Sequence, residues 1–208
     1  GYNGRSLFRV SVETGKGEQL EPPSPSVVGW WLDLEGNPVV RVSVSSGTVR
    51  LFRKQADKWV QFMKMRIREM RERPEYEAVG PSDQQGKYYV LARPPGRDRI
   101  GLYLYDLEKE QFGDPIVENA RYDLSSARIA RDGKRVLYHC YMVHVRICEF
   151  ADQQLESHMR GLRRFFEDTA NVYVYDASQD SKTLLLYVEG PRDPPAYFYY
   201  RVDSKQIE

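Results

Sequence analysis

Long hydrophobic runs are missing from this chain of 208 residues, and so is any strong excess of charge. No apolar stretch approaches the roughly 18 residues of a membrane span, so we expect no membrane contact. Lysine and arginine number 31 against 30 acidic residues, which leaves a net charge of +1. This balance gives no global attraction to nucleic acid, so we expect no nucleic-acid partner. A soluble protein of the cytoplasm or the periplasm fits this composition, and the sequence does not choose between the two.

Recognisable catalytic and cofactor motifs are also missing. The sequence contains no G-x-S-x-G nucleophile elbow, phosphate loop, G-x-G-x-x-G, HExxH or paired CxxC. We therefore assign no catalytic, cofactor-binding or metal-binding residue and expect no cofactor. Acyl transfer needs an activated nucleophile beside a base, so we expect that this chain by itself hydrolyses no peptide.

Cysteine is scarce, since only Cys140 and Cys148 occur. With His139 and His144 they form a cluster in the sequence that suggests zinc ligands. However, residues in a strand alternate between faces, so His139 and Cys140 must point to opposite sides, and we disfavour a metal site. We interpret the cysteines as small apolar residues in neighbouring strands, with a disulfide as the alternative.

A turn followed by an apolar strand recurs at a nearly fixed interval. The turn positions Gly36, Gly86, Gly133 and Ser181 are separated by 50, 47 and 48 residues, and an aspartate precedes each of them. Glycine supplies positive φ in such turns, and aspartate bonds to its own backbone. A period of this length is typical of the blades of a β-propeller, in which each small sheet stacks on its neighbours.

A second strand-and-turn landmark keeps the same interval and divides each unit into two hairpins. Val12, Leu107 and Val202 occupy equivalent places, and each step is 95 residues, or two units. We therefore predict an all-β fold with blades of four-stranded antiparallel sheets, about three full and two partial, in a single partial-propeller domain over residues 1–208. The predicted units are 5–21, 27–68, 76–118, 122–150 and 172–208. Six residues are expected to be buried between stacked sheets: Trp30, Val40, Val42, Val90, Leu137 and Leu185.

Two segments interrupt this rhythm. Between residues 152 and 168 an apolar residue recurs at helical spacing, with Asp152 as N-cap, which predicts one short helical insertion. The helix is expected to cover a blade edge, and its arginines Arg160, Arg163 and Arg164 are candidates for contact with a partner. Residues 63–68 alternate apolar and basic side chains, which indicates a charged outer strand rather than an anion site.

The last unit resembles the closing blade of the propeller in the prolyl oligopeptidase family of serine peptidases, including acylaminoacyl-peptidase and dipeptidyl aminopeptidase-like members. The resemblance depends on the stretch 175–190, on Asp193-Pro194 and on Tyr197-Phe198-Tyr199-Tyr200. Residues 7–16 and 27–38 are also similar to bacterial members. The resemblance implies a noncatalytic propeller that gates peptide access to a C-terminal α/β-hydrolase domain. No position here matches the family's catalytic residues, because these lie in the hydrolase domain.

The chain departs from that family in length, and it starts without Met inside a unit, so we expect a fragment of a longer protein or a truncated propeller. The expected partners are the hydrolase domain and peptides. A free-standing propeller-like scaffold for protein–protein interaction is the alternative function. The apolar residues 7–12 and 196–202 also predict self-association through the terminal blades.

Overall fold

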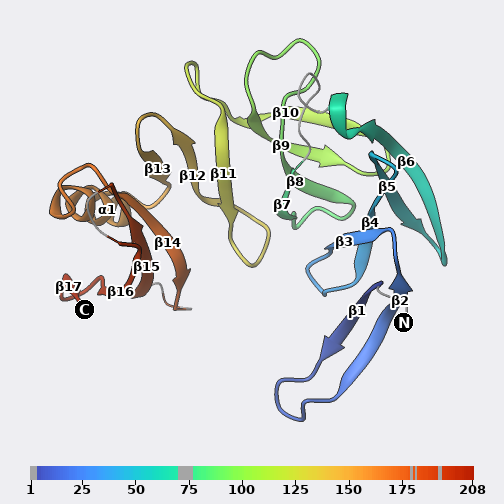
Figure 1. The fold of residues 1–208 in the computed structure, drawn as a ribbon, viewed down its shortest axis with the longest axis horizontal. Helices are drawn as coiled ribbons and strands as arrows, with labels where there is room; N and C mark the ends of the chain where they lie inside the picture. The colour runs from blue at the N-terminus through green and yellow to red at the C-terminus, as the bar shows by residue number, and fades with distance from the viewer. Residues whose placement is uncertain (1–3, 70–76, 179, 181, 192–193) are drawn as a thin grey trace. The chain divides into compact units, whose positions relative to one another are not determined.

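The described residues form five antiparallel sheets, each built from strands that are consecutive in the sequence (Figure 1). The computed structural model describes residues 4–69, 77–178, 180, 182–191 and 194–208. Ser181 of the fourth repeat turn, Asp193 of the Asp-Pro pair and residues 1–3 lie outside the described residues. No helix within these ranges has the length and apolarity that a membrane crossing needs.

The first two sheets contain six strands. They are β1 (Arg5–Val10) and β2 (Gly17–Ser24) in the first, and β3 (Val27–Leu32), β4 (Pro38–Ser45), β5 (Thr48–Gln55) and β6 (Lys58–Arg66) in the second. A 3-10 turn, η1 (Ile67–Glu69), ends the second sheet. The strand β6 therefore ends at Arg66. The sequence pattern predicts that Ile67 continues the alternation, but this residue lies outside the strand and is 48% exposed.

The other three sheets follow in the same order along the chain. They are β7 (Glu77–Pro81), β8 (Lys87–Ala92), β9 (Gly101–Asp106) and β10 (Gln111–Val117); β11 (Leu124–Ile129), β12 (Val136–Met142) and β13 (Arg146–Phe150); and β14 (Asn171–Ala177), β15 (Thr183–Glu189), β16 (Ala196–Arg201) and β17 (Gln206–Ile207). One helix of the described chain, α1 (Gln153–Phe165), precedes the last sheet. The prediction of an all-β fold with three full blades, two partial blades and one helical insertion is confirmed.

Two compact units divide the chain, and each is described by itself. Unit 1 comprises Gly1–Ala120 and Arg128–Arg135, and unit 2 comprises Arg121–Ala127 and Val136–Glu208. That the whole chain is one propeller domain stays a prediction.

The core of unit 1 lies between the β3–β6 sheet and the β7–β10 sheet. Val40 and Val90 are completely buried there, and Tyr103 is 1% exposed. Apolar residues in a strand alternate, so one face of each sheet supplies this core. Trp31 of β3 packs against Tyr88 of β8 with 5.3 Å between ring centroids and a tilt of 33° between the rings, which adds an aromatic contact to the area buried.

The core of unit 2 joins the β11–β13 sheet, α1 and the β14–β17 sheet. Met159 and Leu162 of the helix are 1% and 5% exposed, and Leu186 of β15 is completely buried. The helix begins where the sequence predicts, because the side chain of Asp152 accepts a hydrogen bond from the backbone N–H of Leu155 at 2.8 Å. Its apolar stripe therefore covers the neighbouring strands.

The burial predictions are confirmed at two of six positions. Val40 and Val90 are fully buried, whereas Trp30, Val42, Leu137 and Leu185 are only partly buried. Leu185 shows the reason. Its cross-strand partner is Tyr199, which is 58% exposed, so this face of β15 is more open than the face that carries Leu186.

Candidate functional site

An open cleft of about 900 Å³ lies in unit 1 among the hairpin turns of two successive sheets. It is lined by the β3–β4 and β5–β6 turns of one sheet and by the β7–β8 and β9–β10 turns of the next. Its volume is that of a small-molecule or short-peptide site. The repeated turns are evident in the sequence, but nothing in the sequence predicts that they enclose a cleft.

The repeated aspartates build these turns locally. The Asp33 carboxylate accepts hydrogen bonds from the backbone N–H groups of Glu35 at 3.0 Å and Asn37 at 2.7 Å. Gly36 has φ +80°, a conformation that glycine adopts without steric cost. The turn is thereby fixed, and its exposed Glu35 side chain lines the cleft.

Arg53 joins the two sheets at one wall of the cleft. Its Nη1 donates to the backbone carbonyls of Leu107 at 2.7 Å and Glu108 at 2.9 Å, and its Nη2 lies 3.5 Å from the Glu110 carboxylate. A guanidinium group suits this role because its donors form a rigid planar fork. Within the β7–β10 sheet, the Leu107 N–H donates to the Gly86 carbonyl at 2.9 Å, so the β9–β10 turn that accepts from Arg53 is tied to the β7–β8 turn.

The cationic side chains of the cleft already have partners inside the chain. Arg53 pairs with Glu110, and the Lys54 Nζ lies 3.2 Å from the buried Glu21 carboxylate. The Lys87 Nζ donates to the Gln84 side chain at 2.8 Å. These three positive groups therefore bind to polar groups of the chain itself.

Three carboxylates of the cleft, in contrast, have no ion-pair partner among the described residues. Glu35, Asp83 and Glu108 are exposed, and none of them makes an ion pair with any residue in the described ranges. They come from three different turns, β3–β4, β7–β8 and β9–β10.

Tyr88 contributes to the lining beside these turns. The residue is 4% exposed, and its hydroxyl has no hydrogen-bond partner among the described residues. Burial, and to a smaller degree the negative charge of Asp33, raises the pKa of the Tyr88 phenol, which therefore stays neutral. A buried hydroxyl without a hydrogen-bond partner lowers the stability of the fold.

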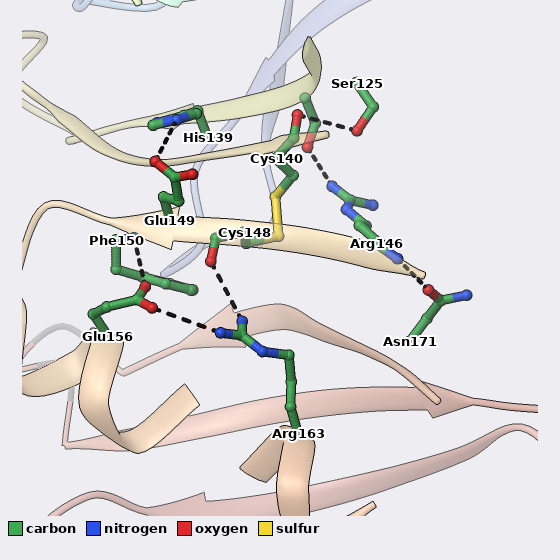
Figure 2. Close-up of a disulfide and its surroundings, with 11 residues drawn as sticks. Ser125, His139, Cys140, Arg146, Cys148, Glu149, Phe150, Glu156, Arg163 and Asn171 are labelled. Carbon is green, nitrogen blue, oxygen red and sulfur yellow. Dashed lines mark hydrogen bonds and ion pairs between the residues drawn. A yellow bond between two sulfur atoms is a disulfide. The ribbon is translucent and has the colours of Figure 1, made fainter. Parts of the chain in front are cut away.

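The three arginines predicted for partner contact lie on α1 of unit 2, but they do not act alike. Arg160 is exposed and lies 3.9 Å from the Glu156 carboxylate, whereas Arg163 is mostly buried and lies 3.6 Å from the same oxygen. Arg163 also donates to the Cys148 carbonyl at 3.4 Å, so it attaches the helix to β13 (Figure 2). Arg164 is exposed. Arg160 and Arg164 therefore remain available for a partner.

A disulfide between Cys140 and Cys148 crosses the β12–β13 hairpin (Figure 2). The two residues are direct cross-strand partners with 4.0 Å between Cα atoms, and both are buried. Their burial was predicted, but they are joined rather than free, so the alternative interpretation is the right one. Bonded sulfurs are not thiolates, and His139 instead lies 3.3 Å from the Glu149 carboxylate.

No metal centre is evident in the part of the chain that the structure describes. Within it, no group of three or more His, Cys, Asp or Glu side chains has an arrangement that could hold a metal ion.

A tyrosine face covers the side of the β14–β16 strands opposite the unit 2 core. It consists of Tyr173, Tyr175, Tyr187, Tyr197 and Tyr199. Tyr175, Tyr197 and Tyr199 are 64%, 56% and 58% exposed. The Tyr197 ring lies 5.4 Å from Tyr175 and 5.0 Å from Tyr187 between centroids. Contiguous exposed aromatic surface of this kind is typical of interaction sites.

Neither a scan against models of protein families nor a search of curated proteins finds a match for this chain. Among solved structures, the chain is similar to oligopeptidase B from Leishmania major, with a TM-score of 0.49 and 13% sequence identity. The similarity covers 93% of this chain and 28% of that chain, so the present chain spans less than a third of the length of oligopeptidase B.

Proposed function

We propose that this chain is the noncatalytic propeller portion of a prolyl oligopeptidase-like serine peptidase and that it gates peptide access to a hydrolase domain. The observation that supports this most directly is the sequence of the last unit, which resembles the closing blade of that family. That sequence forms a complete four-stranded sheet, β14–β17, with the Leu184–Val188 and Tyr197–Tyr200 stretches as its paired central strands.

The first test is the gene beyond Glu208. A G-x-S-x-G motif followed by Asp and then His in hydrolase order is expected there. An immediate stop codon would contradict the proposal.

The second test is kinetic and uses the protein that contains both parts. Deleting residues 1–208 should leave hydrolysis of a short chromogenic substrate measurable and should increase cleavage of folded or long peptides. Equal size selectivity with and without these residues would exclude gating.

A scaffold for protein–protein interaction is the second candidate, and the tyrosine face favours it. In that case the tyrosine face docks a protein partner. A second copy of the chain is one such partner, because its β1 strand offers an apolar surface: Phe8 and Val10 are 53% and 56% exposed. Light scattering over a concentration series should then show an association that Tyr197→Ser with Tyr199→Ser abolishes. The control is Ile116→Ser, which changes an exposed apolar residue of β10. A strictly monomeric chain would rule out self-association.

A further inference from the structure

We propose that α1 covers the outer edge of β13 and so prevents this edge from pairing with the β13 strand of a second copy of the chain. The edge strand, the helix and the start of β14 all belong to unit 2, so the arrangement lies within one compact unit. It is separate from the cleft of unit 1 and from the tyrosine face, and it does not depend on either function proposed above.

The β11–β13 sheet is one strand short. Among the described residues it has three strands, whereas the β3–β6, β7–β10 and β14–β17 sheets have four. Its order leaves β13 on the outside, where an edge strand presents a row of backbone N–H and C=O groups that its own sheet does not pair. Such a row is a template for another strand. In place of a fourth strand, α1 begins at Gln153, directly after β13 ends at Phe150.

The register of the β12–β13 hairpin shows which backbone groups of β13 point outward. Cys140 and Cys148 are direct partners with 4.0 Å between Cα atoms. Partners that exchange backbone hydrogen bonds are farther apart, at roughly 5.5 Å, so the backbone groups of Cys148 point away from β12. This direction alternates along a strand, and the groups of Arg146 and Phe150 therefore point outward too. The backbone groups of these three residues form the outward row.

Two side chains of α1 bond to the outward row (Figure 2). The Phe150 N–H donates to the Glu156 carboxylate at 3.0 Å, and Arg163 Nη1 donates to the Cys148 carbonyl at 3.4 Å. Glu156 and Arg163 also pair with each other, with 3.6 Å between the carboxylate and Nη2, and their side chains are only 22% and 15% exposed. Hydrogen bonds to ionised groups are stronger than neutral ones, so this pair holds the helix on the edge.

A third side chain completes the row from the first residue of β14. The Arg146 N–H donates to the Asn171 side-chain oxygen at 2.6 Å. From Phe150 back to Arg146 the row thus meets an acceptor, a donor and an acceptor at steps of two residues, which are the groups that a neighbouring strand would otherwise provide. Side chains satisfy the row without presenting a new backbone edge, so the sheet ends at β13.

A second copy of β13 fits the uncovered row, because a pair of identical antiparallel strands can be symmetric. Pairing about Cys148 places the outward groups of Arg146 opposite those of Phe150 in the other copy, and the reverse holds for the second contact. Release of the helix uncovers the same row in every copy, so both partners of such a dimer become available together.

The experiment compares two double variants of the full chain by sedimentation velocity over a concentration series. Glu156→Leu with Arg163→Met removes both helix bonds to the row, and its charge changes cancel. The matched control, Glu156→Gln with Arg163→Lys, also removes the ion pair but keeps an acceptor for the Phe150 N–H and a donor for the Cys148 carbonyl. The first variant should self-associate roughly tenfold more tightly than the parent chain, whereas the control should stay within about twofold of it.

Amide hydrogen exchange measured by NMR identifies the surface that associates. In the first variant, the N–H groups of Arg146 and Phe150 should exchange roughly tenfold more slowly at high protein concentration than at low concentration, because a second strand then covers them. In the parent chain their exchange should not depend on concentration. A monomeric first variant with the parent's circular dichroism, or an association that leaves these two amides unprotected, would overturn the proposal.

Asn171→Ala tests the row without changing the helix, and it decides the question if the Leu–Met variant does not fold. It removes the acceptor of the Arg146 N–H, so this amide should exchange roughly tenfold faster at low protein concentration. Self-association should then be roughly threefold tighter than in the parent chain, because only part of the row is uncovered. Unchanged exchange of this amide, or unchanged self-association, would show that the side chains do not keep the edge closed.

Discussion

Replacing Arg53 by methionine should lower the free energy of unfolding of unit 1 by about 2–3 kcal/mol. The guanidinium donates to the carbonyls of Leu107 and Glu108 at 2.7 and 2.9 Å, and its side chain is 20% exposed. Hydrogen bonds from a charged donor contribute about 1.5–3 kcal/mol each. The ion pair with Glu110 adds little, because that carboxylate is 42% exposed. Freeing a long side chain offsets part of this loss, by roughly 1–2 kcal/mol.

The assay is urea unfolding followed by tryptophan fluorescence. All three tryptophans, Trp30, Trp31 and Trp59, lie in β3 and β6, so the signal reports the sheet that carries Arg53. Methionine keeps the apolar stem, and Arg53→Lys keeps the charge but loses the planar fork, so the lysine variant should lose about half as much.

The control for this prediction is Arg50→Met on the same strand. The Arg50 side chain donates to Ser45, a residue of its own sheet, so its loss should cost under about 0.5–1 kcal/mol. If Arg53→Met and Arg50→Met had the same unfolding midpoint, the inference that Arg53 holds the two sheets together would be wrong.

Three other perturbations have defined outcomes. Reduction of the Cys140–Cys148 disulfide, which spans 8 residues, should lower the free energy of unfolding by about 2–3 kcal/mol, as measured by circular dichroism with and without reductant; an unchanged midpoint would contradict this. Met159→Ala should cost about 2–5 kcal/mol, since the side chain is 1% exposed in the unit 2 core, and a loss below 1 kcal/mol would show that it is not a core residue. Burial, and then its hydrogen bond to Glu118, raises the pKa of Tyr103 to about 12. The unfolded phenol ionises near pH 10, so this stabilisation is complete below pH 10 and is lost as the pH rises through about 12. Unfolding measured between those values should therefore show a decline that Tyr103→Phe reduces, and equal slopes would refute the assignment.

The sheets and the helix could be predicted because their signals are local. An aspartate and a glycine or serine near each repeat turn mark where a hairpin reverses, and the described sheets begin and end within a few residues of the predicted units. Asp152 at the start of an apolar 3.6-residue pattern likewise predicts a helix start, and the structure has its N-cap there. These features need no knowledge of distant residues.

The disulfide was within reach of the sequence but depends on strand register. Cys140 and Cys148 become direct partners because the hairpin turns around His144, four positions from each. A turn displaced by one residue would have placed the two side chains on different faces of the hairpin. The alternation of strand residues, used to argue against zinc, does not supply this register by itself.

The functional differences among like residues could not be predicted, because they depend on long-range partners. Arg163 and Arg164 are neighbours in the sequence, but a helix turns by about 100° per residue, so Arg163 lies beside β13 and Arg164 in solvent. The same holds in the cleft. Lys54 is neutralised by Glu21, 33 positions away, whereas Glu108 has no ionic partner among the described residues.

The repeated glycines show why a regular sequence pattern conceals different physical roles. At Gly36, a Cβ atom would meet only the Arg9 side chain at 4.0 Å, so the positive φ alone requires glycine. At Gly133, which also has positive φ, a Cβ atom would lie 2.6 Å from the Asp83 backbone nitrogen. The Gly133 carbonyl accepts hydrogen bonds from the Asp83 N–H at 3.2 Å and from the Tyr89 hydroxyl at 3.2 Å.

The β11–β12 turn at Gly133 therefore connects two repeats within unit 1, because it packs against the β7–β8 turn of the preceding repeat. A glycine repeated once per unit thus fixes a hairpin in one copy and, in another, allows backbone to approach backbone. The period alone predicts the first role. The second role depends on which turns the fold brings together, and so does the cleft, which the β3–β4, β5–β6, β7–β8 and β9–β10 turns line.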